Sequence, residues 1–140
     1  MSFTVKKHPE LPCLIVTVLP GFRLKRDMPE SDRLTREILD AEGPLFNILD
    51  LTQARLALSD VIDGANMGTR GSQPIWKDRR IRQTLLITTS RVIEMAAAGV
   101  NSPAFGNINV RVFPTLEDAL KFVREQPPAP PTDSAQASSD

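Results

Sequence analysis

Three polar residues, Asp50, Ser59 and Asp60, could do chemistry because of where they stand in "NILDLTQARLALSDVID". Asp50 ends a buried strand, and the other two open the next apolar stretch. We expect Ser59 to cap a helix and Asp60 to lie in its first turn. There the hydroxyl would accept a backbone N–H and the carboxylate would meet the positive helix end. Asp50 should accept hydrogen bonds from the loop that it opens. The alternative is that these residues bind a partner.

Further hydroxyl groups follow the predicted strand "QTLLITTS". Ligands of open α/β sheets bind beyond the carboxyl ends of the strands. A ligand crevice at that edge would be lined by Asp50 and by the hydroxyl residues Thr52, Thr88, Thr89 and Ser90. The same hydroxyl groups could instead cap the next helix, and both interpretations stay open.

The segment "WKDRRIR" carries four basic residues, one acid and the single tryptophan of the chain. As a site, it would use Trp76 as an amphipathic anchor and Arg79, Arg80 and Arg82 as a clamp for phosphate or an anionic membrane surface. A charge run of this kind is more often a solvated loop that leads into a strand, and we favour that interpretation.

Catalytic and metal chemistry lack the usual residues. His8 and Cys13 are the only histidine and the only cysteine, and they do not favour a zinc site. Cys13 lies in an apolar run and is expected to be a small buried hydrophobe. There is no G-x-S-x-G motif, so the general bases reduce to carboxylates such as Asp50 and Asp60. We therefore expect no catalytic residue, no cofactor and no enzymatic activity.

The length of the chain and its balance of charged residues indicate one domain with no marked net charge. The chain has 140 residues, with 17 basic and 17 acidic side chains. A neutral chain does not look like a general nucleic-acid binder. Neither the N-terminus "MSFTVKKHPE" nor any other stretch resembles a signal core or a membrane span. We expect a cytoplasmic protein.

The elements that must position these residues alternate along the chain. We expect an α/β fold with a mostly parallel five-stranded sheet, four helices and the order β-β-α-β-α-β-α-β-α. The first two strands should form an antiparallel edge pair, and residues 69–82 a polar connection. The domain should span 1–126, and a disordered tail 127–140, which holds no bulky apolar residue. Strands are expected at 3–9, 13–21, 45–51, 83–90 and 107–113, and helices after an N-cap at Asp27, at 59–67, at 91–99 with Gly99 after its end, and after an N-cap at Thr115.

Three segments in this order, "NILDLTQA", "LALSDVID" and "INVRVFPTLEDALKFVRE", resemble the STAS domain of sulfate transporters and bacterial anti-sigma factor antagonists. The chain is most similar to the small SpoIIAA-like proteins, which share their architecture with CRAL-TRIO lipid-transfer domains. The resemblance covers roughly residues 2–125. It implies a non-enzymatic regulatory module that binds a protein partner, such as an anti-sigma-like regulator, or a small ligand.

The antagonists carry Asp-Ser-Ser-Gly at the head of the second helix, where a serine is phosphorylated. This chain has Leu58-Ser59-Asp60-Val61 instead. Asp60 takes the place of the modified serine, and a slip of one residue would put Ser59 there. By this resemblance Asp60 would act as a fixed negative charge. The alternative is a carrier of a lipid or other apolar molecule, with a pocket between sheet and helices. A homodimer is left open.

Overall fold

The sheet is mixed, and its strands follow the order of the chain. In the computed structural model, which describes residues 2–70, 74–103 and 108–128, five strands lie in the order β1-β2-β3-β4-β5. β1 and β2 are antiparallel, and the pairings β2–β3, β3–β4 and β4–β5 are parallel. The strands are β1 (Phe3–Lys7), β2 (Cys13–Val18), β3 (Leu45–Asp50), β4 (Ile81–Ile87) and β5 (Val110–Phe113).

The expected antiparallel pair at the sheet edge is confirmed, but the expected mostly parallel sheet is corrected to a mixed one. The reason lies in the connection between β1 and β2. It is too short for a crossover, so β1 must run back along its neighbour. The order of elements also gains a 3₁₀-helix, η1 (Ile75–Lys77), between the second helix and the fourth strand.

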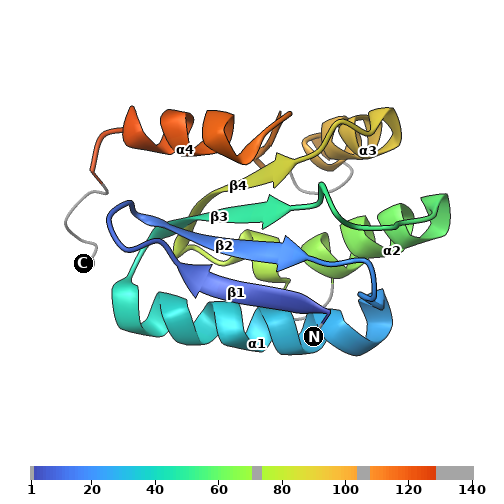
Figure 1. Ribbon diagram of the computed structural model, residues 1–140, viewed down its shortest axis with the longest axis horizontal. Coiled ribbons are helices and arrows are strands. Elements are labelled where there is room, and N and C mark those ends of the chain that lie inside the picture. Colours follow the sequence, from blue (N-terminus) through green and yellow to red (C-terminus); the bar gives the residue numbers. More distant parts are fainter. Residues whose placement is uncertain (1, 71–73, 104–107, 129–140) are drawn as a thin grey trace.

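Helices cover both faces of the sheet (Figure 1). The helices α1 (Leu24–Glu42), α2 (Leu58–Thr69) and α3 (Arg91–Val100) lie in crossovers that each advance one strand in the same direction. Right-handed crossovers in one direction place their helices on the same face, which we call the α1–α3 face. α4 (Leu116–Arg124) follows the last strand and packs on the opposite face, the α4 face.

α1 begins at Leu24, so Asp27 is not its N-cap; Arg23 takes that position. The Asp27 carboxylate instead lies inside the first turns and accepts hydrogen bonds from the backbone N–H of Arg23 and from the Ser2 hydroxyl, each 2.8 Å long. The Arg26 guanidinium and these donors hold the pKa of Asp27 well below its usual range. The sequence pattern misplaced this helix start because an acid can satisfy the N-terminal N–H groups from within the helix.

α2 begins one residue before Ser59, and its N-cap is Ala57, so the expected Ser59 cap is wrong. Asp60 does lie in the first turn, as expected. The helix also continues beyond its expected end at Met67 and contains Gly68. Four apolar residues of α2 divide between two sides of the helix, since two are partly buried and two are exposed. The buried pair is Val61 and Ala65, and the exposed pair is Leu58 and Ile62.

The connection after α2 is less polar than expected. Ile75 in η1 is buried, and β4 begins at Ile81 rather than at Gln83. Ser90 and Thr115 cap α3 and α4 as expected, but α3 continues past Gly99 to Val100. Residues 71–73, residue 107 of the expected fifth strand and 129–140 of the expected tail lie outside the described residues.

Candidate functional site

An apolar cavity of about 110 Å³ lies on the α1–α3 face of the sheet. Val16, Leu49 and Leu86 contribute to its wall from three neighbouring strands, and α1, α2 and α3 supply most of the remainder. Interior packing in proteins leaves few voids larger than a water molecule. A space of this size between sheet and helices is therefore the best candidate for a binding site in the described part of the chain.

Small residues keep this space open. Gly64 and Ala65 of α2, and Ala96 and Ala97 of α3, line the cavity. Each carries at most one methyl group, so these positions take little volume from the space between the elements.

Asn47 is the polar group at the base of the cavity. It lies on the central strand β3, is 2% exposed and lines the cavity. Its Oδ1 has no hydrogen-bond partner among the described residues. Neighbouring Thr84 is its register partner on β4, and the Thr84 Oγ1 is also buried and unpartnered there. Buried polar atoms are nearly always bonded, so both atoms need an explanation.

α1 contributes further polar side chains to the wall. The buried Ser31 and Thr35 hydroxyls donate along their own helix, to the carbonyl oxygens of Met28 (3.0 Å) and Ser31 (2.8 Å). Half-buried Asp32 lies beside them. Burial raises the pKa of the Asp32 carboxyl to about 6, with the nearby Arg36 charge acting in the opposite direction. This carboxyl group therefore changes its charge in a mildly acidic pH range.

Trp76 closes part of the cavity from η1. Its indole ring lies so close to α2 that a Cβ built on Gly68 would be 2.7 Å from Trp76 Cδ2. Glycine at this position therefore lets the ring pack on the helix backbone. The sequence predicted a helix that ends before Gly68 and favoured a solvated loop around Trp76, with a surface anchor as the alternative. The structure joins the two residues in one contact.

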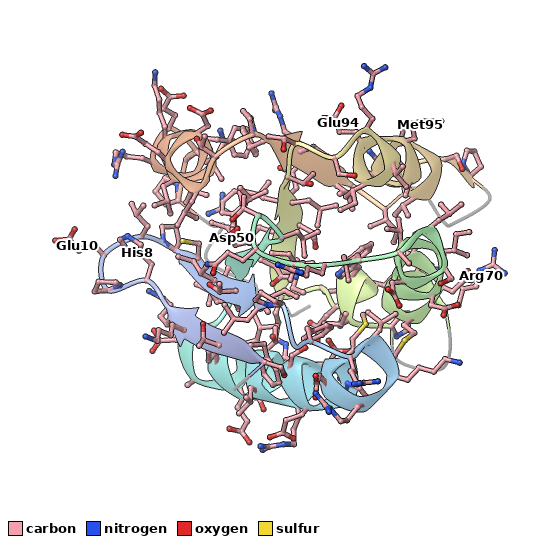
Figure 2. The ribbon with its side chains drawn as sticks, turned by 45° about the vertical axis from the view of Figure 1, so that its right-hand side comes forward. His8, Glu10, Asp50, Arg70, Glu94 and Met95 are labelled. Atoms are coloured by element: carbon pink, nitrogen blue, oxygen red, sulfur yellow. The ribbon has the colours of Figure 1, made fainter. Side chains whose placement is uncertain are left out.

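The three polar residues singled out in the sequence, Asp50 at the end of β3 and Ser59 and Asp60 at the head of α2, do not form one group. Asp60 accepts the backbone N–H of Ala57 (2.9 Å) and lines the cavity, while Ser59 is exposed. Asp50 follows Ile48 in the pattern of the α4 face, and Figure 2 shows it on that side of the sheet. The expected role of Asp50 in its loop is confirmed. It accepts the N–H (3.0 Å) and the hydroxyl (2.7 Å) of Thr52.

The hydroxyls after β4 are engaged in capping. Thr88 Oγ1 accepts the backbone N–H of Ser90 (3.0 Å), and Ser90 Oγ accepts that of Ile93 (3.3 Å). Thr89 is exposed. The lining of the cavity includes none of the proposed crevice residues Thr52, Thr88, Thr89 and Ser90. Of the two interpretations of these hydroxyls, helix capping is the one that the hydrogen bonds support.

The side chains of the proposed anion patch point in different directions. Trp76 faces the core. Arg80 forms ion pairs with Asp78 (2.9 Å) and with Asp40. Arg82 donates to the Pro127 carbonyl (2.7 Å), and its guanidinium lies 4.5 Å from the centre of the Phe46 ring. Arg79 is exposed. The structure does not gather these residues into an anion clamp.

Cys13 and His8 are both engaged in contacts within the fold. Cys13 is fully buried on the α4 face, and burial raises the pKa of its thiol to about 11, which keeps it protonated and unreactive at neutral pH. His8 Nδ1 accepts the backbone N–H groups of Glu10 and Leu11, each at 3.0 Å.

Within 2–70, 74–103 and 108–128 no cluster of three or more potential metal ligands occurs, and no helix is long and apolar enough to cross a membrane.

Comparison with known proteins identifies the fold. No protein-family model and no curated protein match the sequence. The structure is similar to the crystal structure of an uncharacterised DUF3478-family protein with a SpoIIAA-like fold from Shewanella loihica PV-4. The match has a TM-score of 0.53 and 16% sequence identity, and covers 86% of this chain and 91% of the other. The chain therefore has a SpoIIAA-like fold, as its sequence predicted.

The sequence pattern missed most of the residues that give the cavity its chemistry, namely Ser31, Asp32, Thr35 and Asn47. One of them left a readable signal. Asn47 interrupts the apolar strand "LFNILDL". Helices cover both faces of such a strand, so all of its side chains are expected to be apolar. A polar residue in such a run is costly unless it has a partner. The polar residues of α1 gave no comparable signal, because polar residues are common along an amphipathic helix.

Proposed function

We propose that this domain is a non-enzymatic module that binds a small apolar molecule between the sheet and helices α1–α3. The observation that carries the proposal is the cavity of about 110 Å³ with its largely apolar wall. An engineered apolar cavity of roughly 150 Å³ binds benzene. A ligand here is therefore a compound of similar size, or one end of a longer chain that extends out of the cavity.

The cavity also has an energetic cost, which supports binding as its purpose. At about 24 cal/mol per Å³ of empty volume, a cavity of this size lowers stability by up to roughly 2–3 kcal/mol. A ligand that fills the space would recover contacts with its lining. The resemblance to CRAL-TRIO lipid-transfer domains points in the same direction.

Native mass spectrometry of the freshly purified full chain tests the proposal. We expect a small molecule to be retained by the wild-type protein. Ala65→Leu, which adds bulk inside the cavity, should lose it. Ala98→Leu makes the same substitution at an exposed position of α3 and should keep it. A bare wild-type chain that also fails to bind small apolar compounds in titrations would overturn the proposal.

Recognition of a protein partner is the second candidate, and an exposed apolar surface favours it. Two neighbouring helices expose four large apolar side chains, which we call the α2–α3 surface: Leu58 (62% exposed), Ile62 (52%), Val92 (44%) and Met95 (72%). Figure 2 shows Met95 on the outer side of α3. Large apolar side chains that stay exposed on neighbouring elements can mark interaction sites. Ser59 and Asp60 lie at the head of the same helix α2.

A pull-down from the native host tests this second function. Leu58→Lys lies outside the cavity, so it should leave fold and ligand binding intact. It should release a partner that binds the α2–α3 surface. Lys121→Glu on the exposed side of α4 is the control and should release nothing. A partner that binds Leu58→Lys and the wild type equally would remove this surface from consideration.

A further inference from the structure

Three polar side chains that α1 and β3 place on the cavity wall each have an oxygen that can accept a hydrogen bond. The hydroxyl protons of Ser31 and Thr35 are already donated to carbonyl oxygens of α1, so their oxygens can only accept a further bond. Asn47 adds an unpartnered carbonyl oxygen that is buried at the base of the wall. A bound molecule that offered only acceptors would leave these groups unmatched.

The charges on the wall point in the same direction. In the part of the chain that the structure describes, the charged residues that line the cavity are Asp32 and Asp60, and both are acidic. A carboxylate bound in this space would lie near two groups of its own charge, whereas an ammonium group would be attracted. Asp60 already accepts the Ala57 N–H, so Asp32 is the carboxyl group better placed to accept from a ligand.

We propose that the cavity selects small apolar compounds that carry a hydrogen-bond donor, an alcohol or an amine, over the corresponding carboxylates. The inference rests on the proposed ligand-binding function and adds the chemical class of the ligand. Asn47 is its main determinant. Its buried oxygen gains a partner from a donor and stays without one when the ligand offers only acceptors.

Thr84 supplies a matched control for Asn47. The two residues are register partners on adjacent strands, both are buried, and each has an unpartnered oxygen among the described residues. Only Asn47 belongs to the lining of the cavity. Asn47→Leu and Thr84→Val therefore each remove a buried, unpartnered oxygen from the same face of the sheet, and only the first should change ligand preference.

Trp76 provides the readout, because it is the single tryptophan of the chain and lines the cavity. We would titrate the full chain at pH 7.5 with 1-hexanol, 1-hexylamine, hexanoate and hexane, and follow tryptophan fluorescence. The alcohol should bind roughly threefold to tenfold more tightly than hexanoate, which is the range expected for one additional matched hydrogen bond. Asn47→Leu should remove most of this preference, and Thr84→Val should preserve it.

Asp32→Asn separates the two donor classes. Hexylamine is charged at this pH and should lose affinity in the variant, while the affinity for hexanol should stay within about twofold. An equal loss for both compounds would show that Asp32 acts through the shape of the cavity and would remove the amine from the proposed class.

Two further outcomes are decisive. Hexanoate that binds wild type as tightly as hexanol would overturn the donor selectivity while leaving a functional cavity. A complete absence of binding, hexane included, would overturn the proposed function itself. If Asn47→Leu fails to fold, the comparison of hexanol with hexanoate in the wild-type protein still decides the question of selectivity.

Discussion

The two faces of the sheet share the same strands but are packed in different ways. On the α4 face, Ile48, Leu85 and Ile87 are fully buried against a single helix, and the Phe46 and Phe122 rings meet edge to face at 6.0 Å. On the α1–α3 face, the cavity remains, together with two unpartnered polar atoms on neighbouring strands.

The difference shows how the number of covering helices affects packing. A single helix has only the sheet to fit, and α4 buries Ala119 and Val123 against it. Three helices must pack on each other as well as on the sheet, and their separation is fixed by whichever contacts are largest. Where small residues then face the strands, space remains. The closed face suits stability, and the open face has room for a ligand.

The largest expected effect comes from two adjacent leucines of β4. Leu85 is fully buried on the α4 face, and Leu86 lines the cavity on the other. Leu85→Ala should lower the free energy of unfolding by roughly 3–5 kcal/mol, because it opens a void in a closed core. Leu86→Ala should cost about 1–2 kcal/mol, because one side of that residue already lacks neighbours. Urea denaturation of both variants measures the difference, and equal losses would contradict the contrast between the two faces.

A smaller effect is expected from two glycines of α2. A Cβ on Gly68 would lie 2.7 Å from the Trp76 ring, whereas a Cβ on Gly64 would lie in ordinary contact, 3.7 Å from Leu24. Gly68→Ala should therefore destabilise the domain by roughly 1–3 kcal/mol through overpacking. Gly64→Ala should be neutral or stabilise it by up to about 1 kcal/mol, because alanine favours a helix. Thermal unfolding distinguishes the two. Similar melting temperatures would show that the Trp76 ring moves aside freely.

These effects show what could and could not be predicted from the sequence. Apolar periodicity predicted the strands, and the short turn between the first two strands predicted their antiparallel pairing, because each depends on residues close together in the chain. The helix starts near Asp27 and Ser59 were misplaced, since the acids Asp27 and Asp60 satisfy N–H groups from within their helices. The contact of Gly68 with Trp76 was missed because residues distant in sequence must meet before its shape is defined.

The cavity was open to prediction only in part. The fold resemblance suggested a pocket between sheet and helices, but its size depends on side chains that several elements contribute, among them Val16, Gly64 and Ala97. Their distances are set by tertiary packing and leave no local pattern in the sequence. Asn47 was the exception, since a polar residue inside an apolar strand can be read directly.

The next effect concerns pH and the α1–α3 face. Burial raises the pKa of Asp32 to about 6 in the folded state, above the value near 4 of an unfolded aspartate. The folded state therefore holds its proton more tightly, so this group favours folding at low pH and the contribution is lost as pH rises from about 4 to 6. Because the side chain is only half-buried, solvent screening reduces the effect to about 1 kcal/mol.

Asp32→Asn should remove this dependence and stabilise the protein by about 1 kcal/mol at pH 7. Melting temperatures measured between pH 4 and 8 provide the test, with Glu42→Gln at the exposed end of α1 as the control. A wild-type curve that rises across this range and is unchanged in Asp32→Asn would show that other groups govern the response.

The smallest effect is expected at the C-terminus, where α4 leads into the predicted tail. Residues 127–140 lack bulky apolar side chains, so their removal should shift the melting temperature by no more than a degree or two.

One contact allows a finer comparison, because the Arg82 guanidinium on the α4 side donates to the Pro127 carbonyl (2.7 Å). Deleting 129–140 keeps that contact, and deleting 127–140 removes it. If the closed face depends on α4 alone, the two deletions should melt within about one degree of each other. A loss of about 5 °C with the longer deletion only would mean that the Arg82 contact is part of what closes the face. A loss of that size with both would show that the tail itself docks on the domain.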